Sequence, residues 1–169
     1  AESTDPKKHV FEDLAVAAFL IELWNARYND KPFEFRDLGC GNGLLVHILI
    51  MEGFKGIGID ARARKSWKTY PSKVQKCLKE QIIIPSVLLK PHPAIAKTAP
   101  YITNNGRLFQ VPETRSSDPN TVPLMKYYSA ANLLELSMVC TTEEFPPETF
   151  IIGNHLDDLT CWIPLLNFP

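Results

Sequence analysis

The sequence predicts an α/β fold with a doubly wound, mostly parallel sheet. Residues 33–60 show the pattern strand, glycine turn, helix, strand in fewer than 30 residues, which is typical of a βαβ unit with parallel strands. A further short apolar run at 149–153 predicts another buried strand. A chain of 169 residues has room for one domain with a real core.

An amphipathic helix is predicted before the first strand. Apolar residues recur at spacings of three and four between positions 10 and 28, as a helix requires. Asn29, Asp30 and Pro32 then end it. Residues 1–8 are polar and lack an initiator Met, so we expect a flexible tail on a chain cut from something longer. The periodic residues are Val10, Phe11, Leu14, Phe19, Leu20, Leu23 and Trp24.

The βαβ unit follows element by element. Residues 33–38 alternate aromatic and charged side chains and predict a strand that enters a glycine turn at 39–43. The apolar run 44–51 predicts a helix, which Gly53 suits as a left-handed cap. Residues 56–60 predict the second strand, which ends on an acid.

The pattern after Asp60 is coarser. Residues 61–70 and 72–81 each predict a helix, and the apolar run 82–84 is stopped by proline. Residues 85–123 hold seven of the fourteen prolines, so we expect an irregular insertion within a single domain spanning 9–169. A last helix is predicted over 128–136.

The net charge of -1 is a sum of unlike parts: -4 over residues 1–54, +9 over 55–107 and -6 over 111–169. This composition excludes a uniformly basic protein and a wholly disordered chain. The four cysteines lie far apart, and there is no signal peptide or long apolar run, so we expect a reduced cytoplasmic protein without a membrane segment. Neither the cysteines nor the four histidines show metal-ligand spacing, so we expect no metal.

The glycine turn indicates a nucleotide-like cofactor. Glycines remove the Cβ atoms that hold a ligand away from the backbone, and the next helix directs free N–H groups at the same place. Asp60, at the end of the second strand, is placed to accept hydrogen bonds from two ribose hydroxyls. The simpler alternative is a tight turn, with Asp60 as the N-cap of a following helix.

The glycine spacing favours S-adenosylmethionine over a dinucleotide. Dinucleotide turns show G-x-G-x-x-G, whereas here glycines alternate and an acid precedes them. That acid, Asp37, would repel a pyrophosphate but suits the ammonium group of a methionine moiety. The predicted cofactor residues are Asp37, Gly39, Gly41, Asn42, Gly43 and Asp60.

Three sequence blocks carry a resemblance to a known family. They are Asp37-Leu38-Gly39-Cys40-Gly41-Asn42-Gly43, Arg64-Lys65-Ser66-Trp67, and Ile152-Gly153-Asn154-His155-Leu156-Asp157 with Trp162-Ile163-Pro164. The chain resembles the eukaryotic tRNA (uracil-2′-O-)-methyltransferases that act on uridine 44 of serine tRNA. The resemblance implies a Rossmann-like class I methyltransferase fold, S-adenosylmethionine as methyl donor and tRNA as acceptor.

The predicted catalytic residues are Asn154, His155 and Asp157. If strand 149–153 lies beside strand 33–38, these residues face the methyl group held over the glycine turn. His155 has a suitable ordinary pKa for a base near neutral pH, and Asp157 could serve as the base or orient His155. The alternative is a polar loop that makes turns and caps a helix.

The basic segment after Asp60 predicts an RNA contact. Its cations offer phosphate contacts and its aromatic residues offer stacking surfaces, although a solvated helix face is the ordinary alternative. The predicted RNA-binding residues are Arg62, Arg64, Lys65, Trp67 and Lys68.

The length also supports a second functional hypothesis. A complete class I fold continues with three more strands after the one ending near Gly153, and only 16 residues follow it here. We therefore expect a C-terminally truncated domain. The alternative function is a non-catalytic binding or scaffold domain with an incomplete methyltransferase fold.

Overall fold

A computed structural model describes residues 6–29, 31–85, 88–91, 93–101, 108–112, 125–136 and 138–166. Within these ranges a four-stranded parallel sheet has the order β3-β2-β1-β8. Its strands are β1 (Glu34–Leu38), β2 (Gly56–Asp60), β3 (Leu78–Glu80) and β8 (Thr149–Ile152). The predicted α/β class and parallel βαβ unit are confirmed, as is the pairing of the strand after residue 148 with β1.

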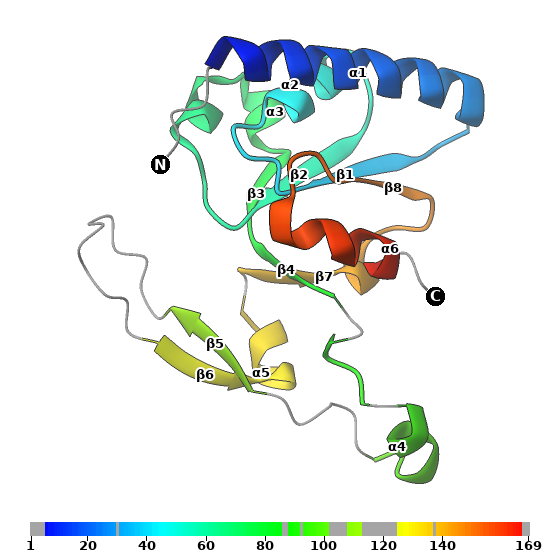
Figure 1. The fold of residues 1–169 in the computed structure, drawn as a ribbon, viewed down its shortest axis with the longest axis vertical. Coiled ribbons are helices and arrows are strands. Elements are labelled where there is room, and N and C mark those ends of the chain that lie inside the picture. The colour runs from blue at the N-terminus through cyan, green and yellow to red at the C-terminus, as the bar shows by residue number, and fades with distance from the viewer. Residues whose placement is uncertain are drawn as a thin grey trace.

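Helical segments cover both faces of this sheet (Figure 1). On one face lie α1 (Pro6–Tyr28), α2 (Leu44–Met51) and α3 (Ser72–Gln75); on the other lie the 3₁₀ helix η4 (Asp157–Trp162) and α6 (Ile163–Leu166). The alternation along β1 explains the two layers, because Phe35 packs with the first group and Leu38 with the second. Because β1 and β8 pair in parallel, their carboxyl ends meet at one edge of the sheet, between the two helical layers.

Helix α1 buries only some of the apolar residues that predicted it, among them Leu20 and Trp24. The buried stripe consists of Asp13, Ala17, Leu20 and Trp24, at helical spacing. Phe11 and Phe19 are 71% and 65% exposed. The helix begins at Pro6, so residues 6–8 are helical where a tail was expected, and residues 1–5 lie outside the described ranges.

Residues 61–81 form less helix than predicted. A 3₁₀ helix, η1 (Lys65–Thr69), and the short α3 replace two longer helices, and Leu78–Glu80 is the strand β3. The expected helix 72–81 fails because Leu78 is buried beside the glycine turn while its backbone pairs with Gly58. Sheet pairing overrides the local helical pattern here.

The segment expected to be irregular contains regular elements. Helix α4 (Pro93–Thr98) and strand β5 (Leu108–Pro112) lie within it, and β5 pairs in antiparallel fashion with β6 (Met125–Ser129). The predicted helix 128–136 is thus shortened to α5 (Ala130–Leu134), which Ser129 caps by accepting from the Asn132 N–H. Strands β4 (Ile82–Ile84) and β7 (Val139–Thr141) form a separate parallel pair, followed by the 3₁₀ helix η3 (Thr142–Glu144).

Two further features concern the cysteines and the helices. Cys40, Cys77, Cys140 and Cys161 are free thiols. None of the helices in the described ranges has the length and apolar character that crossing a membrane requires.

Candidate cofactor pocket

The glycine turn between β1 and α2 requires glycine for steric reasons. Gly39, Gly41 and Gly43 all have positive φ, at 67°, 53° and 78°. A Cβ on Gly39 would lie 2.7 Å from Leu156, and one on Gly43 would lie 3.1 Å from Leu78. The backbone conformation disfavours a side chain at all three positions and space disfavours one at Gly39 and Gly43, so the turn exposes its backbone to whatever binds above it.

Asp60 holds this turn in place. Its Oδ2 accepts a hydrogen bond from the Gly41 N–H at 2.9 Å, and its Oδ1 accepts one from the Arg62 N–H at 2.9 Å. The Arg64 guanidinium lies 3.8 Å from Oδ1. Asp60 is therefore tied to the glycine turn, while its bonding to ribose hydroxyls stays a prediction that would use the remaining lone pairs.

The segment after Asp60 folds back onto the same turn. The Trp67 indole N–H donates to the Gly41 carbonyl at 2.9 Å, and the Ser66 hydroxyl donates to the Asn42 carbonyl at 2.8 Å. Trp67 is only 8% exposed. The prediction that Trp67 stacks on RNA is therefore wrong for this structure, because the ring is packed against the domain and supports the glycine turn.

A pocket of about 430 Å³ opens above the turn. Asp37 at the end of β1 forms part of its wall, and its Oδ1 is buried without a hydrogen-bond partner among the described residues. Burial raises the pKa of Asp37 to about 8, and the neighbouring Asp13 and Asp60 carboxylates add to the increase. A buried carboxyl without a partner suits a cationic group. The lining residues are His9, Asp13, Asp37, Gly39, Cys40, Gly41, Asn42, Leu45, Arg64, Asn154 and His155.

The loop after β8 and helix α1 form the opposite wall. The Asn154 side-chain amide donates to the Asp13 carboxylate at 3.2 Å. Burial raises the pKa of Asp13, and the His155 and His9 rings partly offset this. His155 has a φ of 55°, an uncommon conformation for a residue other than glycine. Asn154 and His155 thus reach the pocket as predicted, while Asp157 begins η4 and its side chain lies outside the described part.

The contribution of α1 to the pocket was missed in the sequence. His9, Glu12 and Asp13 lie on a helix that was interpreted only as amphipathic packing. A signal was present, since Asp13 falls on the same stripe as Ala17, Leu20 and Trp24, where an acid is unexpected. A charged residue on a buried helical stripe is a functional candidate, and here it bonds to Asn154.

Comparison with known proteins identifies the family. A family model described as predicted AdoMet-dependent methyltransferase matches residues 1–85, just over half of the chain, including β1, the glycine turn and β2. The chain belongs to this methyltransferase family. S-Adenosylmethionine is thus the family's cofactor, in agreement with the choice made from the glycine spacing.

Curated relatives extend the similarity to the entire chain. The chain is 63% identical to a tRNA (uracil-O(2)-)-methyltransferase of Debaryomyces hansenii, over 99% of the chain and 32% of that protein. It is 60% identical to the Kluyveromyces lactis protein of the same name (100% and 32%) and 58% identical to that of Saccharomyces cerevisiae (100% and 30%). The chain spans about a third of the length of these relatives. The resemblance to tRNA (uracil-2′-O-)-methyltransferases is confirmed, whereas the names of these relatives specify neither serine tRNA nor uridine 44.

The cations of this methyltransferase-family chain lie beside the pocket. Arg62, Arg64, Lys65 and Lys68 follow the carboxyl end of β2 and are exposed. Arg64 also lines the pocket. Four exposed cations next to this pocket form a positive rim, which is consistent with the predicted polyanionic acceptor.

Proposed function

We propose that this chain supplies the S-adenosylmethionine-binding part of a tRNA (uracil-2′-O-)-methyltransferase. The observation that carries the proposal is the buried Asp37 Oδ1, which has no hydrogen-bond partner in the described ranges and lies in a pocket floored by an alternating glycine turn. We take tRNA as the methyl acceptor because relatives that are 58–63% identical to the chain carry this enzyme name. Serine tRNA, its uridine 44 and a cytoplasmic location belong to the proposal as well.

The residues present fit this cofactor. Asp37 would pair with the ammonium group of the methionine moiety, because a buried carboxyl gains a charged partner there. The backbone of Gly39 to Gly43 would lie against the cofactor, with Asn42 on the pocket wall. Asp60 would hold the ribose as well as the turn. When bound, S-adenosylmethionine supplies an electrophilic methyl group.

The acceptor would approach from the β8 side. Methyl transfer to a ribose requires the 2′-oxygen, the methyl carbon and the sulfur in line, so positioning is a large part of the catalysis. Asn154 and His155 line that wall, and the exposed Arg62, Lys65 and Lys68 would hold phosphates nearby. The proposed doubly wound sheet would place these residues where the order of its parallel strands reverses, between β1 and β8.

Calorimetry of the chain with two ligands tests the cofactor site. S-Adenosylmethionine has the ammonium group, whereas 5′-methylthioadenosine keeps the adenosine and lacks the amino acid. Asp37→Asn should weaken binding of the first at least tenfold and leave the second unchanged. Equal loss for both ligands would show that Asp37 only maintains the fold, and absence of S-adenosylmethionine binding by the folded wild-type chain would overturn the proposal.

A tRNA assay tests the acceptor. Methyl transfer from labelled S-adenosylmethionine should occur with serine tRNA and disappear when uridine 44 lacks its 2′-hydroxyl. Transfer that persists on the deoxy tRNA would refute the site. A chain that binds the cofactor and methylates no tRNA would instead favour the non-catalytic binding domain.

A further inference from the structure

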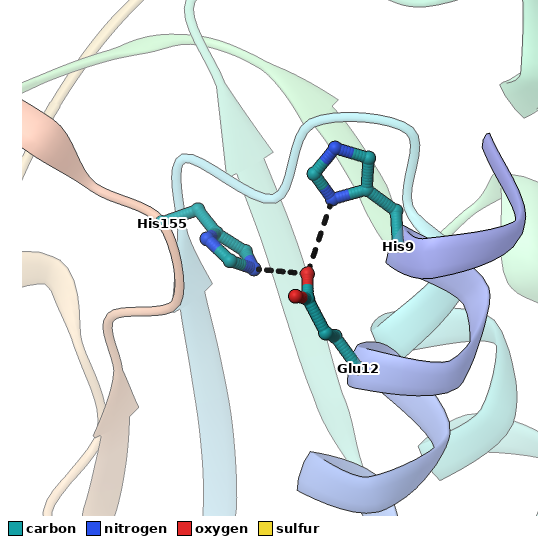
Figure 2. A group of neighbouring side chains, drawn as sticks. All are labelled: His9, Glu12 and His155. Atoms are coloured by element: carbon teal, nitrogen blue, oxygen red, sulfur yellow. Dashed lines mark ion pairs between the residues drawn. The ribbon is translucent and has the colours of Figure 1, made fainter. Parts of the chain in front are cut away.

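Three potential metal ligands converge at the rim of the pocket (Figure 2). His9 and Glu12 project from the start of α1, and His155 projects from the loop after β8 toward the same carboxylate. The Glu12 Oε2 lies 3.4 Å from His9 Nδ1 and 3.6 Å from His155 Nε2. One ligand atom from each residue lies within 4.8 Å of the other two.

These separations fit ligands around one ion. Zinc lies about 2.0–2.2 Å from nitrogen and oxygen ligands, so neighbouring ligands in a tetrahedral site are about 3.3–3.5 Å apart. Direct nitrogen–oxygen hydrogen bonds have a typical length of about 2.7–3.2 Å. Both contacts to Glu12 are longer than that and close to the spacing of ligands that share a cation.

The fold prearranges the three side chains. His9 and Glu12 are three residues apart and thus lie on one face of α1. The Asn154–Asp13 hydrogen bond ties the β8 loop to the next position of the same helix. His155 then adopts a left-handed backbone conformation, with its ring edge-on to His9 at 5.7 Å between centroids. A strained residue held at such a place is consistent with a functional demand.

We propose that His9, Glu12 and His155 bind a divalent transition-metal ion such as Zn²⁺. Two imidazoles and one carboxylate form a three-ligand set that leaves a coordination position open, as in catalytic rather than structural zinc sites. The sequence-based expectation of no metal rested on spacing along the chain, and His9 and His155 are brought together only by the fold.

The position of the site suggests its use, which rests on the proposed methyl transfer. His9 and His155 both line the pocket, so the ion lies beside the proposed cofactor site. An ion there would bind the ribose 2′-oxygen of the acceptor and lower the pKa of the 2′-hydroxyl, whose proton would pass to water in the pocket. The Nε2 lone pair of His155 is then a metal ligand, so His155 holds the ion rather than accepting the proton.

Cobalt titration of the chelator-treated chain tests the site, with zinc binding measured by calorimetry. We expect one ion to bind per chain. The bound cobalt should show the visible absorption bands typical of nitrogen and oxygen ligands, without a thiolate-to-cobalt charge-transfer band. His155→Ala and Glu12→Gln should each weaken binding at least tenfold. Glu22→Gln is the matched control, because Glu22 is an exposed residue of the same helix.

Two further measurements make the outcome decisive. Circular dichroism and binding of 5′-methylthioadenosine establish that each variant is folded, and His155 is a half-exposed loop residue whose loss the core should tolerate.

Unchanged metal affinity in both variants would overturn the proposal, as would a wild-type chain that binds no cobalt or zinc. A thiolate band that disappears in Cys161→Ser would assign the metal to that exposed cysteine instead. None of these readouts requires methyl transfer, so the site can fail independently of the proposed function.

Discussion

At the scale of single residues, Asp37 combines burial, charge and position. Its side chain is almost fully enclosed, its Oδ1 has no hydrogen-bond partner in the described structure, and two other carboxylates lie nearby. Such a group stays protonated near neutral pH because ionisation would place an unpaired charge in a poorly solvated place. A cationic ligand would reverse this preference.

Binding of S-adenosylmethionine should therefore release a proton from Asp37. The free chain holds the proton up to a pKa of about 8, and the ammonium group favours the ionised form. Affinity should rise with pH between about pH 5.5 and about pH 7.5, by up to about tenfold per unit. Calorimetry in buffers of different ionisation enthalpy measures the released proton. Asp37→Asn should bind with little pH dependence; a wild-type profile as flat as that of the variant would contradict the assignment.

The same carboxyl should make stability depend on pH. The folded chain keeps the Asp37 proton up to a pKa of about 8, whereas the unfolded chain releases it near 3.8. The contribution of Asp37 to stability is complete below pH 3.8 and is lost as the pH rises to about 8. Urea unfolding should show Asp37→Asn gaining stability relative to wild type across this range. A constant difference between the two proteins would exclude the shifted pKa.

At the scale of elements, η1 has two sides with different surroundings. Its buried side supports the glycine turn through Trp67 and Ser66, and its exposed side carries Lys65 and Lys68. The sequence indicated one role for the whole segment because charge and aromatic residues alternate along it. Substitutions on the two sides should therefore affect different ligands.

Trp67→Phe tests the buried side. It keeps an aromatic ring but removes the donor to the Gly41 carbonyl, which should cost about 1 kcal/mol of unfolding free energy. S-Adenosylmethionine binding should weaken because the turn is less firmly held, while tRNA affinity at saturating cofactor should not change. Denaturant unfolding and filter binding measure these effects. Loss of tRNA affinity with unchanged stability and unchanged S-adenosylmethionine affinity would instead support stacking of Trp67 on RNA.

Charge reversal tests the exposed side. Arg62, Lys65 and Lys68 changed together to Glu should weaken tRNA binding and reduce the slope of log affinity against log salt by about 2 to 3. The matched control is Lys31, Lys55 and Lys76 to Glu, three exposed lysines that precede β1, β2 and β3 at the opposite edge of the sheet. Equal losses in the two triple variants would show that only total charge matters.

At the scale of the whole molecule, Trp24 joins α1 to the sheet. The centroid of its ring lies 5.0–5.7 Å from the ring centroids of four phenylalanines. Two of these are on β1 and β8, and two are on the segments that precede β1 and β2. These are Phe33, Phe35, Phe54 and Phe150. Because α1 also forms one wall of the pocket, this aromatic cluster positions His9, Glu12 and Asp13.

Trp24→Ala should cost about 3–5 kcal/mol of unfolding free energy, because a large fully buried side chain leaves a cavity. Phe19→Ala on the same helix removes a mostly exposed ring and should change stability by less than about 0.5 kcal/mol. Thermal and urea unfolding measure both. Similar values for the two variants would mean that α1 does not pack on the sheet as described.

The fold was predictable where local chemistry and tertiary demand agree. Gly39, Gly41 and Gly43 have backbone conformations that few other residues adopt. The turn and the two strands on either side of it were therefore predicted correctly from the sequence. Prediction failed at Leu78–Glu80, where pairing with β2 outweighed a helical pattern, and at Met125–Ser129, where β5 is the partner. No local pattern contains that information.

The sequence by itself determined the family and the parallel βαβ unit, with Asp37 before its glycine turn and Asp60 at the end of its second strand. These features depend on neighbouring residues whose steric and hydrogen-bonding needs are fixed by their identity. The tertiary structure decided that Trp67 is internal, that α1 lines the pocket, and that His9 and Glu12 meet His155. The physical reason is that these contacts join residues up to 146 positions apart, as His9 and His155 are, and their proximity depends on how α1 and the β8 loop pack on the sheet.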